Sequence, residues 1–384
     1  MIGVRPLRIA ILSDVNNPHT LRWARVLATR GHELLIFSLV APSEDYFVGF
    51  SNVFVETAGV AERVVTARQG SFGKGQYLRA IPTLRRALRD FRPQVVHAHY
   101  VTSYGLLALL SGWRPFAVSV WGMDVFDAPK SALLRQIVRA VLFRADAVLS
   151  TSHVMKQQTL RVAQTDISVI PFGVDVARFV PAERRTGRFT IGTVKSLEPK
   201  YGIEYLVRAF ARLPEYGVAL EHKSLLICGA GSLRQYLEEL ATELGVRESV
   251  EFSGRIGYEQ VHTYHQRLDI AVFPSVEDSE SFGVAVVEAQ ACGVPAIVSD
   301  VGGLPEVVDS GTTGLVVEPR DVDGLARAIA RLVLDDEERK RMGIAARARV
   351  VDMYSIDECV VSLEVVLTEL ASRGGKRRSE RVSY

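Results

Sequence analysis

The sequence has few cysteines and no long apolar segment. Its 384 residues include three cysteines, which lie far apart and form no CxxC pair, so we expect neither a disulfide framework nor a thiolate metal site. No stretch approaches the roughly 20 consecutive apolar residues that a membrane-spanning helix needs. The N-terminus also lacks the apolar core of a signal peptide. We therefore expect a protein of the reducing cytoplasm that neither spans a membrane nor is exported.

The sequence also lacks a strong overall charge, but its charge is unevenly distributed. The formal net charge is only +2, yet residues 1–180 hold 21 Lys and Arg against 12 Asp and Glu, whereas residues 181–384 hold 25 against 32. The basic first half predicts contact with something anionic, such as a phospholipid surface or a phosphate-bearing acceptor. A solvated basic helix face is the alternative. Because the basic runs lack interleaved aromatic residues, nucleic acid is not an expected partner.

Length and hydrophobic periodicity predict two α/β domains. A chain of this length exceeds the usual size of one core, and the polar segment 181–188 indicates a linker. We expect an N-terminal Rossmann-like domain over residues 1–180 and a C-terminal one over residues 181–372, whose last helix could pack back on the first domain. Residues 373–384 are expected to form a flexible basic tail.

In both halves short apolar runs alternate with helical patterns, which predicts doubly wound parallel sheets because parallel strands need helical crossovers. The expected strands are 7–12, 33–37, 95–97, 116–120, 147–150 and 168–171, then 189–194, 224–228, 250–252, 270–273, 296–298 and 314–317. The expected helices are 20–29, 77–90, 133–143, 203–213, 233–244, 258–266 and 282–291. Since ligands bind at the carboxyl ends of such strands, we expect a cleft lined by the carboxyl ends of both sheets.

The most informative stretch is residues 274–308, PSVEDSESFGVAVVEAQACGVPAIVSDVGGLPEVV. Glu280 precedes the expected helix and Glu288 lies about two turns inside it, so one carboxylate could address a sugar while the other reaches a ribose. The backbone amides of Phe282, Gly283 and Val284 lie at the helix start, where unpaired donors and the helix dipole favour a phosphate. This stretch therefore predicts a site for a phosphate-linked sugar.

An ordered series of motifs resembles the family 4 glycosyltransferases, also called glycosyl transferases group 1. The E-x7-E pair is followed by CGVP, and further matches are VVHAHY at 95–100, PFGVD at 171–175, GTVKSLEPKYGIEYL at 192–206, GAGSLRQYLEELA at 229–241 and EFSGRI at 251–256. The resemblance covers nearly the whole chain. It implies the GT-B fold, with two facing Rossmann-like domains. It also implies a retaining enzyme that moves a hexose from a nucleotide diphosphate donor to a lipid-linked, polysaccharide or small-molecule acceptor.

The resemblance also assigns donor residues. Lys195 and Lys200 would bind the diphosphate, and Glu280 would orient the hexose. Glu288 would accept hydrogen bonds from the ribose hydroxyls, and Arg255 and Ile256 would lie beside the base. Two ordinary loop lysines are the alternative for Lys195 and Lys200. Gly229 and Gly231 follow an apolar strand, in the context of a turn that approaches a phosphate or a base. A dinucleotide fingerprint would need a third glycine where Arg234 stands, so NAD is not favoured.

On the acceptor side, the loop 13–20 follows the first strand, and His19 could meet the acceptor or the diphosphate there. The alternative is that His19 only caps a helix beginning at Thr20. His97 and His99 share one face of a strand, and we favour His99 as a cleft residue and His97 as structural. Relatives often carry a histidine where Trp121 stands, so its role would pass to the backbone, to Asp124, or to nothing.

We expect no cofactor and no catalytic metal, because the implied family does not use the metal-binding DxD motif. The DxD at Asp321 to Asp323 directly precedes a helix, which predicts capping. In the implied front-face route the departing diphosphate draws the acceptor proton, so no protein nucleophile is needed. The rival functions are a nucleotide-sugar epimerase or phosphorylase of the same fold, and a non-catalytic sugar-nucleotide-binding subunit.

Overall fold

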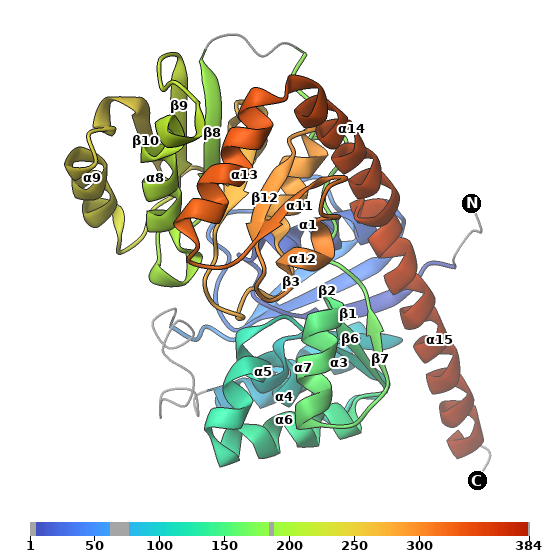
Figure 1. Cartoon of the computed structure of the whole chain (residues 1–384). Helices are drawn as coiled ribbons and strands as arrows, with labels where there is room; N and C mark the ends of the chain where they lie inside the picture. The colour runs from blue at the N-terminus through green and yellow to red at the C-terminus, as the bar shows by residue number, and fades with distance from the viewer. Residues whose placement is uncertain (1–4, 62–76, 184–187, 383–384) are drawn as a thin grey trace. The chain divides into compact units, whose positions relative to one another are not determined.

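The computed structural model describes residues 5–61, 77–183 and 188–382, without the side chains of residues 123, 124, 130 and 375–382. The chain forms two compact units (Figure 1). Unit 1 joins Met1–Phe172 to Ile356–Tyr384, and unit 2 is the continuous segment Gly173–Ser355. Both units are α/β, which confirms the fold class that the periodicity predicts.

Unit 1 contains a seven-stranded parallel sheet in the order β3-β2-β1-β4-β5-β6-β7. Because the strand order reverses beside β1, strands β1 and β4 meet at a topological switch point, where ligands bind in such sheets. The strands are β1 (Arg8–Leu12), β2 (Glu33–Ser38), β3 (Val53–Thr57), β4 (Val95–His99), β5 (Phe116–Val120), β6 (Ala147–Ser150) and β7 (Ile167–Val169).

The described helices of unit 1 cover both faces of this sheet. They are α1 (Pro18–Thr29), α3 (Ile81–Phe91), α4 (Leu106–Ser111), α5 (Met123–Asp127), α6 (Ala132–Arg144), α7 (His153–Val162) and α15 (Ile356–Val382), and a π-helical turn, Tyr100–Gly105, leads into α4. In β1, Ile9 and Ile11 join the core beneath α1 and α15, whereas Ala10 and Leu12 join the core beneath α3 and α4. Both faces are apolar because a parallel sheet is buried on both sides.

Unit 2 contains a six-stranded parallel sheet in the order β10-β9-β8-β11-β12-β13. Its switch point lies between β8 and β11. The strands are β8 (Phe189–Val194), β9 (Lys223–Cys228), β10 (Val250–Gly254), β11 (Ile270–Phe273), β12 (Ala296–Ser299) and β13 (Gly314–Val317).

The helices of unit 2 follow its strands. They are α8 (Ile203–Ala211), α9 (Arg234–Glu243), α10 (Val261–Gln266), α11 (Val284–Ala291), α12 (Leu304–Val307), α13 (Val322–Leu334) and α14 (Asp336–Met353). Helices α8, α9 and α13 share one core over the sheet, and α11 packs against α10 and α14. Many helices start where the sequence supplies a cap, such as Asp335, whose carboxylate accepts from the amide of Glu338 at 2.8 Å.

Two boundaries differ from the sequence prediction. The first unit ends at Phe172 rather than at residue 180, because the segment after it packs on unit 2, where the Arg347 guanidinium donates to the carbonyls of Val176 and Phe179. Helix α15 returns to unit 1, as was allowed for, but it continues to Val382, where a flexible tail from residue 373 was expected. Within the described ranges, no helix has the length and apolar character needed to cross a lipid bilayer.

Candidate functional site

The switch point of unit 2 holds a close ion pair. Lys195 directly follows β8, and Glu280 lies in the loop after β11, so both side chains belong to the carboxyl edge of the sheet. The Lys195 Nζ lies 2.8 Å from the Glu280 Oε2, and the two side chains are only 16% and 13% exposed. Two residues that the sequence analysis assigns to one site are therefore in direct contact.

Lys200 joins this pair through an aromatic ring. The ammonium of Lys195 lies 4.4 Å from the centre of the Tyr201 ring, and that of Lys200 lies 4.8 Å from it. Cations within about 6 Å of such a ring are attracted by its negative faces. Both lysines are thus held near one point, and Tyr201 is a site residue that the sequence analysis missed.

Lys195 carries its positive charge firmly. Burial alone would lower the pKa of its ammonium, but the Glu280 carboxylate, Tyr201 and the hydrogen bond to Glu280 raise the pKa above its usual value. Lys195 is therefore protonated at neutral pH and remains so in mildly alkaline solution. A fixed positive charge at this position suits an anionic ligand.

Glycines bring the loop after β9 against the loop after β8. A Cβ on Gly229 would lie 1.9 Å from the Lys195 carbonyl oxygen, and one on Gly231 would lie 2.4 Å from that of Leu197. The amide of Leu197 donates to the carbonyl of Ala230 at 3.0 Å. The two glycines therefore have a packing role here, whatever they do for a ligand.

A second glycine pair supports the Glu280 loop. The amide of Gly303 donates to the carbonyl of Glu280 at 2.7 Å, and a Cβ on Gly302 would lie 2.2 Å from the same oxygen. The amide of Val276 donates to the Lys200 carbonyl at 2.9 Å, which links this loop to the lysine loop. Only residues without side chains allow such close backbone approach.

Helix α11 begins beside this loop. Gly283 is its N-cap residue with a φ of 96°, Phe282 before it is buried, and Val284 is the first helical residue. Amides in the first turn of a helix have no partner within the helix and face the positive end of its dipole. This start lies a few residues after Glu280, so the amides and the two lysines belong to the same edge of unit 2.

Glu288 and the predicted base-side residues lie further along this edge. Glu288 is buried within α11, and its Oε2 lies 3.8 Å from the Nε2 of His265 on α10. Arg255 and Ile256 directly follow β10, beside the Gly229 loop after β9, because β9 and β10 are neighbours. Arg255 is exposed and Ile256 is half-buried. Every donor-side residue predicted from the sequence thus lies at or near the carboxyl edge of one sheet.

The switch point of unit 1 holds a buried hydrogen-bond chain. The His99 Nδ1 lies 2.8 Å from the Ser13 Oγ, which lies 2.7 Å from the Thr20 Oγ1, and the His97 Nε2 lies 2.7 Å from the Ser119 Oγ. The two imidazoles share one face, with ring centres 4.6 Å apart. Both are buried, so burial does not reproduce the distinction drawn between a cleft His99 and a structural His97.

Both of these histidines are neutral at pH 7. Burial lowers the pKa of His97 to about 4. Burial, with smaller effects of His97 and His19, holds the pKa of His99 well below its usual value. Neutral imidazoles can accept or donate hydrogen bonds but do not bring charge to the site.

Trp121 lies at the centre of an aromatic cluster in unit 1. Its ring stacks on His99 with centres 4.0 Å apart and meets Tyr100 and Phe172 edge-on at 5.4 and 5.1 Å. His19 stacks on Phe172 at 4.1 Å. Trp121 thus fills space in the core at the position where the resemblance implies a histidine. The side chain of Asp124, predicted to share that role, lies outside the described residues.

Two capping predictions have different outcomes. The Asp321 carboxylate accepts from the Gly324 amide at 2.9 Å at the start of α13, which confirms the capping interpretation of the DxD. The alternative of a cap by His19 is wrong, because α1 begins at Pro18 and the Asn17 side chain caps it by accepting from the His19 amide. In the part of the chain that the structure describes, no three His, Cys, Asp or Glu side chains are grouped as metal ligands.

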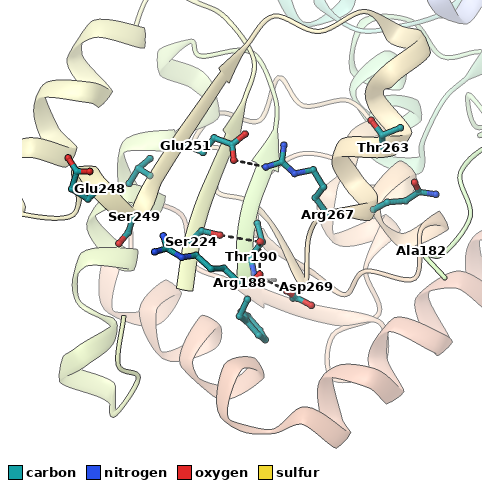
Figure 2. A pocket seen from close by; sticks show the side chains of 13 residues that line it. Ala182, Arg188, Thr190, Ser224, Glu248, Ser249, Glu251, Thr263, Arg267 and Asp269 are labelled. Carbon is teal, nitrogen blue, oxygen red and sulfur yellow. Dashed lines mark hydrogen bonds and ion pairs between the residues drawn. The ribbon is translucent and has the colours of Figure 1, made fainter. Parts of the chain in front are cut away.

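A large hollow of about 760 Å³ lies at the opposite edge of unit 2 (Figure 2). It is lined by residues at the amino ends of strands, including Thr190, Ser224 and Val250. Figure 2 shows Arg267 directed toward Glu251 and Thr190 lying between Ser224 and Asp269. These polar groups satisfy one another, and a full strand length separates them from Lys195. Despite its size, this hollow is therefore not the candidate functional site.

Comparison with known proteins identifies the family. The glycosyl transferases group 1 model matches residues 178–349, and the glycosyl transferase 4-like model matches residues 8–152. A glycogen synthase of Mycobacterium tuberculosis is 30% identical, over 94% of this chain and 92% of its own length. A D-inositol 3-phosphate glycosyltransferase of Nocardia farcinica is 30% identical, over 90% of this chain and 86% of its own.

Solved structures agree on the fold. Sucrose-phosphate synthase from Thermosynechococcus elongatus has a TM-score of 0.79 at 22% identity, over 96% of this chain and 100% of that one. Anabaena HepE in complex with UDP-glucose has a TM-score of 0.76 at 17% identity, over 95% and 100%. The resemblance and the GT-B fold inferred from the motifs are confirmed, and the chain belongs to the glycosyl transferases group 1 family of glycosyltransferases.

Proposed function

We propose that this glycosyltransferase moves a hexose from a nucleotide diphosphate donor, with retention of configuration and without a divalent metal. The observation that carries the proposal is the Lys195–Glu280 ion pair at the switch point of unit 2. Lys200 lies beside it on the Tyr201 ring, and α11 begins close by in sequence. This edge combines two ammonium groups, helix amides and one carboxylate, which is the set that a diphosphate bonded to a sugar requires.

The chemistry follows from where charge develops. As the bond between the sugar and the diphosphate breaks, the leaving oxygens become more negative, and fixed donors that meet them there lower the barrier. Lys195, Lys200 and the amides of Gly283 and Val284 would supply these donors. Glu280 would hold the sugar through its hydroxyls. The acceptor proton would pass to the departing diphosphate, so that the protein contributes positioning and charge.

The identity of the donor is the first point to test. The printed names of relatives and neighbours point to two bases: a GDP-mannose-dependent mannosyltransferase of Mycolicibacterium smegmatis is 31% identical over 65% of this chain, and HepE was solved with UDP-glucose. A panel of UDP and GDP sugars should therefore contain one that raises the melting temperature and is slowly hydrolysed. If no nucleotide sugar does either at saturating concentration, the proposal fails.

The lysines and the metal are tested on the same donor. Lys195→Met should abolish the thermal shift, whereas Lys195→Arg, which keeps the charge, should retain part of it. Activity should survive EDTA. A loss with EDTA that magnesium restores would contradict the metal-independent route.

For the acceptor side we propose a lipid-linked or polysaccharide acceptor, reached in the cytoplasm at an anionic membrane face. Helix α6 exposes Leu133 (71%) and Phe143 (57%) among the exposed Arg135, Arg139 and Arg144. Apolar side chains flanked by arginines suit a surface of anionic lipids. Vesicles with phosphatidylglycerol should bind the protein at low salt, and pure phosphatidylcholine vesicles should not. Equal binding to both, or to neither, would contradict the membrane part.

An epimerase of the same fold is separated by a single assay. Labelled donor incubated with the enzyme alone should give only slow hydrolysis by the proposed function. If an epimeric nucleotide sugar accumulates without any acceptor, the enzyme is an epimerase and the proposed transfer activity is wrong.

A further inference from the structure

His265 is a buried residue that the proposed chemistry leaves without a role. It lies in α10, which packs against α11, the helix that carries Glu288. Its side chain is fully buried, and the ring of Phe179 lies 6.2 Å away. The imidazole is therefore enclosed by protein and is adjacent to the carboxylate predicted to bind the donor ribose.

Neither ring nitrogen of His265 has a hydrogen-bond partner among the residues that the structure describes. The Glu288 Oε2 lies 3.8 Å from the Nε2, which is beyond hydrogen-bond distance. Leaving a buried polar group unsatisfied is unfavourable, and such groups are few in folded proteins. An apolar side chain would fill this space at a lower free-energy cost. The imidazole is therefore explained better by a second state of the enzyme in which one ring nitrogen makes a hydrogen bond.

We propose that His265 is a positioning residue for Glu288, and this inference rests on the proposed function. When a nucleotide's ribose engages Glu288, the carboxylate closes the gap by roughly an ångström and accepts a hydrogen bond from the His265 Nε2–H. A carboxylate has about four acceptor positions, so this bond leaves the other oxygen for ribose hydroxyls. This hydrogen bond needs a proton on Nε2 of the imidazole, and Nδ1 takes no part in it. His265 thus fixes the orientation in which Glu288 recognises ribose.

A role in packing alone makes a different prediction. His265→Met keeps a side chain of similar length and removes both unsatisfied nitrogens, so the free enzyme should be at least as stable as wild type. If His265 positions Glu288, the same variant should nevertheless bind nucleotide more weakly. A residue that only fills space cannot give unchanged or higher stability together with weaker nucleotide binding.

The experiment measures melting temperature and dissociation constants for UDP and GDP and for their 2′,3′-dideoxy forms. For whichever base wild type binds, His265→Met should weaken the ribonucleotide about tenfold, the scale of one hydrogen bond to a charged group. His265→Gln, whose amide can take the place of Nε2–H, should stay within about threefold of wild type. For the dideoxy form, wild type and His265→Met should differ by less than about twofold, because the hydroxyls that Glu288 reads are absent.

Three results would overturn the proposal. Equal binding of UDP or GDP by wild type and His265→Met removes the positioning role and leaves the proposed function intact. An equal loss for the dideoxy form assigns the effect to general damage. If wild type binds neither UDP nor GDP, nor any other nucleoside diphosphate, the proposed function fails and this inference fails with it. Should His265→Met not fold, His265→Asn replaces it, because the shorter amide cannot reach the Nε2 position and should bind more weakly than His265→Gln.

Discussion

Lys195 and Glu280 neutralise each other in the free enzyme, at 2.8 Å and largely out of water. In the proposed function, donor binding would redistribute a pair that is already formed. The phosphate would take part of the interaction with Lys195, and the sugar hydroxyls would take part of the interaction with Glu280. Removal of either partner would leave a poorly solvated charge, so the stability of each free variant has to be measured beside its response to ligand.

Glu280→Gln is the corresponding test. The amide can still accept from Lys195 but holds sugar hydroxyls less strongly, so we expect kcat to fall by about a hundredfold or more while the nucleotide dissociation constant changes by less than about threefold. Glu277→Gln is the matched control, because Glu277 lies in the same loop and is exposed. Unimpaired turnover in Glu280→Gln would remove Glu280 from the reaction.

His97 should make the protein sensitive to acid. Its folded pKa of about 4 lies below the unfolded value of 6.5, so the unfolded chain takes up the proton first as the pH falls. Its contribution to stability is complete above about pH 6.5 and declines toward pH 4, by roughly 3 kcal/mol in total. His97→Gln keeps a partner for Ser119 and removes the titration, so urea unfolding should depend less on pH across this window.

The control for that prediction is an exposed histidine. His222 is exposed and has a positive φ, which asparagine tolerates, so His222→Asn should keep the acid sensitivity of wild type. If His97→Gln and His222→Asn lose stability equally between pH 6.5 and 4, burial of His97 does not cause the effect.

At the scale of the element, the sequence predicts those strands and helices whose apolar pattern is complete. Strand β5 is buried at every residue, and the helix expected at 133–143 occurs as Ala132–Arg144. Strand β3 was missed because it is an edge strand with exposed Phe54 and Val55, so it shows no buried alternation. Hydrophobic periodicity reflects burial on one face, and a largely exposed edge strand therefore shows little periodicity.

The position of the predicted donor-side residues along one sheet edge was predictable, because they come from short, ordered motifs at strand ends. The contacts between these motifs were not predictable. Gly302 and Gly303 hold the Glu280 loop by close backbone approach, and Tyr201 lies against both lysines. The spacing of these residues in the sequence indicates neither contact. In unit 1, Trp121 was noticed as a departure, yet its stacking on His99 depends on the register between β4 and β5. Pairing between distant segments is not encoded locally.

Besides its apolar contacts, helix α15 is attached to unit 1 by one buried carboxylate. Glu364 accepts from the Arg30 guanidinium at 2.7 and 2.8 Å and lies 2.8 Å from the His32 Nε2. The His32 Nδ1 accepts from the Leu7 amide at 3.0 Å, so the proton of the neutral imidazole is on Nε2 and is donated to Glu364. The four groups therefore form one satisfied network beneath the helix.

Glu364→Ala should lower the free energy of unfolding by about 3 kcal/mol or more, because it leaves Arg30 and His32 without their shared acceptor. Chemical denaturation measures this. Glu369→Ala on the same helix is the control, since Glu369 is exposed and its contact with Arg373 is long at 3.7 Å, so the change should stay within about 0.5 kcal/mol. Comparable losses in the two variants would mean that the network does not anchor α15.

At the scale of the whole molecule, two units have separate cores and are connected twice. The connections run through Phe172–Gly173 and Ser355–Ile356, and beside them the Val174 amide donates to the Tyr354 carbonyl at 2.8 Å. The sequence analysis placed the boundary at the polar segment near residue 181, whereas the first unit ends at Phe172. Polarity marks exposure, whereas the division between units depends on which core a segment packs against.

Separate cores predict separate responses to ligand. Calorimetry should show two unfolding transitions. A bound nucleotide should raise the free energy of unfolding of unit 2 alone, by about 2.7 kcal/mol at a hundredfold excess over the dissociation constant. Lys195→Met should cancel that increase without moving the other transition. A single transition, or an equal rise of both, would show that the units unfold together.

The return of α15 to unit 1 has a consequence for biosynthesis. Leu363, Leu367 and Leu370 complete the core that Ile9 and Ile11 begin, yet they leave the ribosome only after all of unit 2. At a synthesis rate of roughly 5 to 20 residues per second, the first-made sheet would wait on the order of 10 to 40 seconds for its last helix. Unit 2, made from one uninterrupted stretch, can be finished first, so the nascent amino-terminal sheet would expose an apolar face to chaperones until α15 emerges.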